Sequence, residues 1–304
     1  MRNSPGIHQN ILNRWALFSF ALVCPLLSLI PAGLPVVRAQ EAVGQIRALP
    51  LFVQCGKMVS DQTKTSAAMA KTSAAMAAIK AGDRTKRVEA ITSLGRSCER
   101  EASALIIPLL RDDDPTVKIA AIEALAQLGD RNSIEPLIEA ITDKDWRVRA
   151  ALGRALCSFQ IYQSNNAALN ALANPGGAEV KDEGDLRARC LAILSINQLH
   201  DVRFSRKAVG FVFTFLNYQD PKLHAIAEET MAELKNTRNG YHELTGILKQ
   251  SNFPDFRRKA VYWLGKYQIE EAREFLTEIA ASDRDPVVQK LAAEALSSIK
   301  KQSK

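Results

Sequence analysis

The sequence predicts an all-α fold, an α-solenoid of about seven stacked helix pairs. The segment 112–129 begins with Asp-Pro, continues with apolar residues at helical spacing and ends on glycine. Copies of this segment recur downstream, and a second short amphipathic segment precedes each copy. One such pair cannot bury its own apolar stripe, whereas stacked pairs share a continuous core.

The template segment carries the signals of a complete helix. Asp114 is a predicted N-cap, Pro115 occupies the first helical position and Gly129 is a predicted stop. The apolar residues that share one face are Val117, Ala121, Ala124, Leu125 and Leu128. This face is expected to lie against the core.

The copies differ in strength but keep the same frame. Their first apolar residues are Val117, Val148, Leu186, Leu223, Phe256 and Val288, at intervals of 31 to 38 residues. An earlier copy covers 83–95, and the copy at 186–197 is the weakest. The preceding helices are expected at 103–110, 134–141, 167–173, 209–216, 241–248 and 272–279.

The pattern from Asp114 to Gly129 resembles the HEAT repeat, of the short bacterial sort first named from phycocyanobilin lyases. The resemblance covers about residues 83–299. It implies a polar ladder between repeats, in which an Asp precedes the second helix and a base follows its first apolar residue. Asp112 with Lys118 and Asp143 with Arg149 fit, Asp283 is followed by Gln289, and Arg187 and Arg257 follow Lys181 and Ser251. The bases at these positions are expected to be structural.

The first 39 residues contain three arginines and no acidic residue, and Trp15 to Val37 is a long apolar run. Val37 and Ala39 fit a cleavage site before Gln40, so 1–39 is predicted to be a signal peptide. An uncleaved membrane anchor is the alternative, since the run could span a bilayer. In either case we expect the body outside the cytoplasm, in the periplasm or secreted.

The remaining chain is expected to divide into three parts. Residues 40–61 are interpreted as an N-terminal cap or irregular lead-in, 62–299 as the solenoid and 300–304 as a basic tail. The solenoid begins with an alanine-rich helix in which Met69 and Met76 share a face, more typical of core than of a binding stripe.

Four cysteines follow the leader, and an oxidising compartment permits disulfides. Cys55 and Cys98 flank the first helix pair, which favours a bridge between them. Cys157 and Cys190 fall at different helical positions and are interpreted as small helix residues.

We predict no catalytic residue, cofactor or metal site. HEAT-type deoxyhypusine hydroxylases bind two irons through several His-Glu pairs, but His242-Glu243 is the one such pair here. Bilin lyases act on cytoplasmic pigment proteins, which conflicts with the leader. The net charge of +7 is mild and partly carried by the leader, so no nucleic-acid partner is expected.

The concave side of the second helices is the predicted partner site. Its small and apolar side chains would form a groove for a partner helix or extended segment. The candidate residues are Ile119, Ile122, Ala150, Arg154, Ala188, Leu191, Arg258 and Tyr262, with Trp146 at an inter-helix turn. The alternatives are that these helices are simply solvated or that the first helices cover them.

The sequence therefore predicts an exported, non-catalytic scaffold that binds a protein or peptide and touches membrane only through an uncleaved leader. One alternative is an enzyme of the lyase or hydroxylase kind with a site scattered over several repeats. Another is a binder of an anionic envelope polymer.

Overall fold

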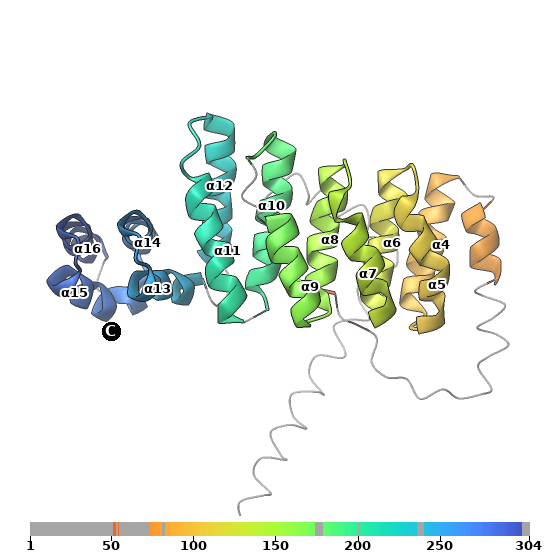
Figure 1. The fold of residues 1–304 in the computed structure, drawn as a ribbon, viewed down its shortest axis with the longest axis horizontal. Coiled ribbons are helices and arrows are strands. Elements are labelled where there is room, and N and C mark those ends of the chain that lie inside the picture. The colour runs from red at the N-terminus through yellow and green to blue at the C-terminus, as the bar shows by residue number, and fades with distance from the viewer. Residues whose placement is uncertain are drawn as a thin grey trace, which may run out of the picture. The chain divides into compact units, whose positions relative to one another are not determined.

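The computed structural model describes residues 51–52, 54, 73–80, 83–173, 179–199, 201–235 and 240–299 of the 304. These residues form helices and turns without a strand, which confirms the all-α solenoid (Figure 1). The chain divides into Met1–Gly44 and Gln45–Lys304. The predicted leader, most of the predicted cap and the tail lie outside the described residues. Among the described helices, none is both long and apolar enough to span a membrane.

The second helix of each pair matches the predicted copies. These helices are α4 (Arg84–Arg96), α6 (Pro115–Leu128), α8 (Trp146–Ser158), α10 (Glu183–Asn197), α12 (Pro221–Lys235), α14 (Pro254–Lys266) and α16 (Pro286–Ser298). Consecutive members α4, α6, α8, α10 and α12 pack on one another, as do α14 and α16.

The first helices are shorter at the N-terminal end of the array. They are α5 (Ser103–Ile106), α7 (Ile134–Glu139), α9 (Tyr162–Ala167), α11 (Val202–Phe215), α13 (Gly240–Gln250) and α15 (Arg273–Ser282). The first three continue into short non-α helices, the 3₁₀ helices η4 (Ile107–Arg111) and η6 (Ala140–Thr142) and the π-helix η7 (Ala168–Ala173). Helix α11 starts seven residues before the predicted 209–216, which adds about two turns of mixed polar and apolar residues to the expected apolar segment.

Aspartates begin most of the second helices. The Asp114 carboxylate accepts from the Thr116 amide at 2.8 Å, Pro115 occupies the first turn, and Gly129 ends α6 with φ of 64°. Because a β-carbon disfavours positive φ, glycine is the residue of choice at that stop. The template helix therefore begins and ends as predicted.

Small residues let consecutive second helices approach closely. A β-carbon on Gly95 would lie 2.8 Å from Ala124 Cα, and one on Gly153 would lie 3.0 Å from Ala192 Cβ. The same relation holds near the C-terminus, where a β-carbon on Gly265 would lie 2.8 Å from Ala295 Cβ. Close packing of this kind buries both helix backbones and tolerates no added volume.

Ion pairs join successive repeats along the starts of the second helices. The base of one repeat reaches an aspartate of the next, which precedes the second helix in three pairs and, as Asp185, lies in the first turn of α10 in the fourth. The pairs are Arg87–Asp112, Lys118–Asp143, Arg149–Asp185 at 2.9 Å and Arg257–Asp283 at 2.9 Å. We call this set the ladder, and it confirms the structural role expected for Lys118, Arg149 and Arg257.

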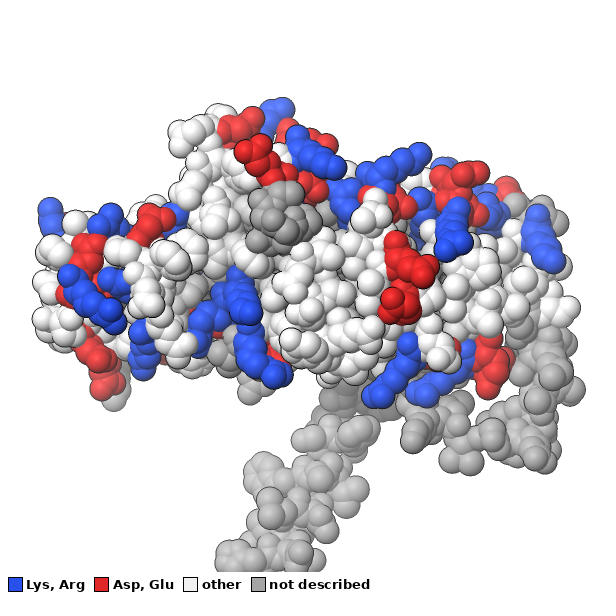
Figure 2. Space-filling view, in the orientation of Figure 1, with Lys and Arg blue, Asp and Glu red and all other residues white. Residues whose placement is uncertain are grey.

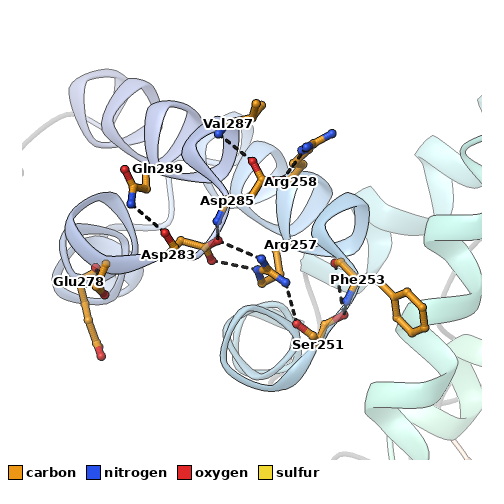
Figure 3. A network of polar contacts seen from close by, with 10 residues as sticks. Ser251, Phe253, Arg257, Arg258, Glu278, Asp283, Asp285, Val287 and Gln289 are labelled. Carbon is orange, nitrogen blue, oxygen red and sulfur yellow. Dashed lines mark hydrogen bonds and ion pairs between the residues drawn. The ribbon is translucent and has the colours of Figure 1, made fainter.

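Two of the ladder arginines also bond the turn before their own helix. Arg257 donates to the Ser251 carbonyl at 2.9 Å as well as to both Asp283 oxygens (Figure 3). Arg149 likewise donates to the Asp143 carbonyl at 2.9 Å. The base thus ties the preceding turn, its own helix and the next repeat together.

The ladder pattern changes at both α12 and α14, where Tyr218 and Ser251 occupy the aspartate positions before the helices. The base position of α12 holds His224, whose Nε2 lies 3.9 Å from Glu228, and the aspartate position before α14 holds Ser251. The junction is held differently, because Lys259 Nζ donates to the Phe213 carbonyl at 2.8 Å and so fastens α14 to α11. Lys266 pairs with Glu228 of α12 at 3.0 Å.

We predict that Arg257→Ala lowers the free energy of unfolding by about 3 kcal/mol, because it leaves the buried Asp283 carboxylate unpaired. The two side chains of this pair are 7% and 5% exposed. Urea denaturation measures the change. Arg147→Ala, which removes an exposed partner of Asp145, serves as the control and should cost less than about 1 kcal/mol. Equal losses in the two variants would contradict a structural ladder.

We predict opposite effects for two glycine-to-alanine changes. Gly95→Ala should lower the melting temperature, because its methyl group meets the Ala124 backbone. Gly210→Ala should raise it, because the nearest side-chain atom, Phe256 Cε2, is 3.6 Å away and alanine favours helix by about 1 kcal/mol. Thermal unfolding followed by circular dichroism distinguishes the two, and a stable Gly95→Ala would rule out the close approach.

Candidate binding site

The predicted concave groove is closed in the structure. Five of its apolar side chains are at most 8% exposed: Ile119, Ile122, Ala150, Ala188 and Leu191. The expectation that they are open to a partner is wrong, because adjacent second helices pack so closely that small residues fill the space between them. Glutamate at these positions would disturb packing rather than a free surface.

Arg154, another predicted groove residue, is engaged inside the chain. Its guanidinium pairs with Glu123 of α6 and lies 4.1 Å from the centre of the Phe52 ring. The Phe52 amide donates to Ser158 Oγ at 3.0 Å, so a segment far away in sequence covers this part of α8. Burial raises the pKa of Glu123 and lowers the pKa of Arg154, each opposed by the partner charge.

The remaining candidates differ in exposure. Trp146 is half-buried against α10, where a β-carbon on Gly184 would lie 2.5 Å from the indole Cδ1. Arg258 bonds Asp285 at 2.6 Å. Tyr262 is 51% exposed and lies edge-on to Trp263 at 5.3 Å. Of the predicted partner residues, Tyr262 and Arg258 therefore keep the most accessible surface.

The cysteines separate into two classes. Cys98 is disulfide-bonded, and its predicted partner Cys55 lies outside the described residues, so that pairing stays a prediction. Cys157 and Cys190 are free and buried. Burial raises the pKa of the Cys157 thiol far above its ordinary range and that of Cys190 to about 12, so both stay protonated and unreactive.

A pocket of about 1050 Å³ opens where the ladder is interrupted. It lies between α11, α13 and the start of α14, and we call it the junction pocket. Tyr218 and Ser251, which occupy the ladder-aspartate positions before α12 and α14, both line it. Its volume is slightly above the usual range for small-molecule sites, about 300–1,000 Å³.

One face of α11 forms a wall of the junction pocket. Its lining residues follow the helical spacing i, i+3, i+4, i+7, i+8 and i+11: Arg203, Arg206, Lys207, Gly210, Phe211 and Thr214. The first turns of this face are cationic, and the later turns are aromatic or small. Figure 2 shows lysine and arginine gathered over the lower end of α11 and the adjoining α13.

Aromatic rings form the opposite wall. Phe253 is 68% exposed and lies 5.8 Å from the Phe256 ring, which in turn meets the buried Phe213 edge-on. The Phe253 side chain points away from the ladder residues around Arg257 (Figure 3). An aromatic ring exposed on a pocket rim is available to a ligand without rearrangement of the fold.

The cations of the pocket are held to different degrees. Arg203 pairs with Asp201 at 2.7 Å. Arg206 bonds Gln250 and lies 3.9 Å from Glu243. Burial raises the pKa of Glu243, and the charge of Arg206 opposes this only in part.

Lys207 is exposed and forms no ion pair with the described residues. Arg189, at the pocket's inner side, donates to Asp185 and to the Glu179 carbonyl, both at 2.9 Å. The pocket therefore offers one open lysine beside arginines that are fixed in place.

The junction pocket was not predicted from the sequence, although two of its features are visible there. The cationic and aromatic residues of 203–214 follow one helical face, and the ladder aspartate is replaced at Ser251. Neither feature predicts a cavity by itself, because the cavity depends on how α11 packs against α13. Among the described residues, no group of His, Cys, Asp and Glu could hold a metal ion.

Three solved structures are similar in fold. The phycocyanin lyase complex of CpcE and CpcF from Nostoc sp. PCC7120 is 20% identical, with 82% of this chain and 90% of that chain covered and a TM-score of 0.36. Human deoxyhypusine hydroxylase in complex with glycerol is 19% identical, with coverages of 79% and 88% and a TM-score of 0.40.

An archaeal HEAT-like repeats protein from Thermococcus onnurineus NA1 is 13% identical, with coverages of 88% and 98% and a TM-score of 0.32. Similarities this distant say nothing about what the present chain binds. No curated protein matches the sequence.

The family model for HEAT repeats matches residues 72–157 and 241–304. The helix pairs between these two ranges keep the same alternation of first and second helices. The chain is a HEAT-repeat protein.

Proposed function

We propose that this HEAT-repeat protein is a non-catalytic scaffold that holds a partner protein in the junction pocket. The observation that carries the proposal is the union of an exposed phenylalanine, further aromatic rings and fixed arginines in one pocket of about 1050 Å³. Aromatic residues and arginine are the side chains most enriched at protein interfaces, and they dominate binding energy there.

The geometry favours binding over chemistry. The pocket's arginines are tied to carboxylates or amides, its thiol-free lining offers no nucleophile paired with a base, and its walls are largely apolar.

We propose further that the protein acts outside the cytoplasm. The leader-like residues 1–39 motivate this proposal, and the disulfide bond of Cys98 supports it, because disulfides persist mainly in oxidising compartments.

We predict that Phe253→Ala weakens capture of the partner by about tenfold or more, because it removes the exposed rim of the pocket. The experiment is a crosslinking pull-down of the tagged full chain from intact cells, with the captured protein identified by mass spectrometry.

Tyr262→Ala is the matched variant for the second-helix face, since Tyr262 is also an exposed aromatic residue of the same repeat. If Tyr262→Ala loses the partner and Phe253→Ala retains it, the partner binds to the second helices, and the proposal that it binds in the junction pocket is refuted. Circular dichroism of both variants verifies that they are folded.

We predict that the mature protein begins at Gln40, because the segment before it has the features of a signal peptide. Mass spectrometry of the protein extracted from cell fractions measures both its N-terminus and its compartment. A chain that begins at Met1 and resides in the cytoplasmic fraction would contradict export.

A further inference from the structure

We infer that the junction pocket recognises an acidic segment in which carboxylates are followed, a few residues away, by an aromatic or large aliphatic side chain. This inference rests on the proposed function and specifies the chemistry of its partner. It follows from how charge and apolar surface are distributed along α11.

The cationic end of the pocket is complementary to carboxylates. Arg203, Arg206 and Lys207 lie within about one turn of α11. Lys207 has no ion pair with the described residues, and Arg206 has its nearest carboxylate at 3.9 Å. A ligand carboxylate beside Lys207 would therefore gain an attraction that no described group supplies.

The guanidinium of Arg206 is held in one position by its contacts with α13. A β-carbon on Gly246 would lie 2.7 Å from Arg206 Nη2, so the guanidinium rests directly on α13. Its Nη1 also donates to Gln250. A guanidinium fixed in this way loses little conformational entropy when it binds a carboxylate.

The apolar end lies further along the same helix. Phe211 follows the cations on α11, and the same pocket is lined by Phe253, just before α14, and by Phe256 in its first turn. The rise from Lys207 to Thr214 is about 10 Å, which is spanned by about three residues of extended chain. A single short segment can therefore place a carboxylate at one end and a ring at the other.

Gly210 lies between the cationic and apolar ends of the pocket, and because it has no side chain it does not project into the pocket. Phe256 Cε2 is the one neighbour within 4 Å of a β-carbon built there, at 3.6 Å. A ligand backbone can thus approach α11 closely between its acidic and apolar groups.

A flexible polyanion fits these features less well than a peptide. Such polymers need a row of unpaired cations, whereas the cations along the second helices are engaged in the ladder. The aromatic wall would also remain unused. An acidic peptide with an apolar residue uses both halves of the pocket.

The test measures binding of a fluorescein-labelled peptide, Glu-Asp-Glu-Gly-Gly-Phe-Leu, to the full chain by fluorescence anisotropy. We expect saturable binding that weakens about tenfold when Phe-Leu is replaced by Ser-Ser, and about tenfold when the acids are replaced by glutamine. Poly-glutamate, the probe for a polyanion site, should bind more weakly than the peptide. Equal binding of the Ser-Ser peptide, or tighter binding of poly-glutamate, would overturn the inference.

Variants of the protein locate the binding. Lys207→Glu should weaken peptide binding about tenfold or more, because it replaces attraction by repulsion. Lys144→Glu, a change of the same charge at an exposed turn, is the matched control and should bind like the original chain. Gly210→Leu should block binding by filling the pocket at this position while preserving the helix. Undiminished binding to Lys207→Glu or Gly210→Leu would contradict the assignment.

The peptide experiment and the partner-capture experiment can fail independently, so they test the acidic-segment inference and the proposed function separately. If Phe253→Ala loses its cellular partner but the peptide does not bind, the scaffold at this pocket stands and the acidic-segment inference fails. If neither the partner nor the peptide depends on the pocket, both fail.

Discussion

The array depends on the contact between one second helix and the next. At one end of that contact, a base reaches an aspartate at the start of the following helix or just before it, as in Arg149–Asp185 and Arg257–Asp283. At the other end, a glycine lies against an alanine of the neighbour, as in Gly95 with Ala124. The charged contact fixes the register of the repeats, and the small residues set their separation.

These two contacts also determine where a ligand can bind. Wherever both are present, the second helices close against one another and leave no groove, which is why Ala150 and Ala188 are buried. Where the ladder is replaced at His224 and Ser251, Lys259 joins α14 to α11 instead. The junction pocket lies beside this replacement, so an interruption of the regular repeat creates the accessible surface. Irregular positions of a repeat protein are therefore the first places to look for its binding site.

The sequence predicts the fold well because the fold rests on local signals. Asp114, Pro115 and Gly129 mark the ends of α6, and the spacing of apolar residues assigns its buried side. The binding surface was harder to predict, since small residues such as Ala150 suit an open groove and a close helix contact equally well. Helical spacing cannot distinguish the two, because the distinction depends on the distance to a neighbouring helix.

In our proposal, the partner binds in the junction pocket and not on the second helices. The most direct measurement is photo-crosslinking in intact cells, with p-benzoylphenylalanine placed at Phe253 in one strain and at Tyr262 in another. Both side chains are exposed, at 68% and 51%, so each probe can reach a partner. We expect a light-dependent adduct to one protein from Phe253 and little or none from Tyr262. An adduct from Tyr262 alone would contradict this proposal and return the partner to the second-helix face.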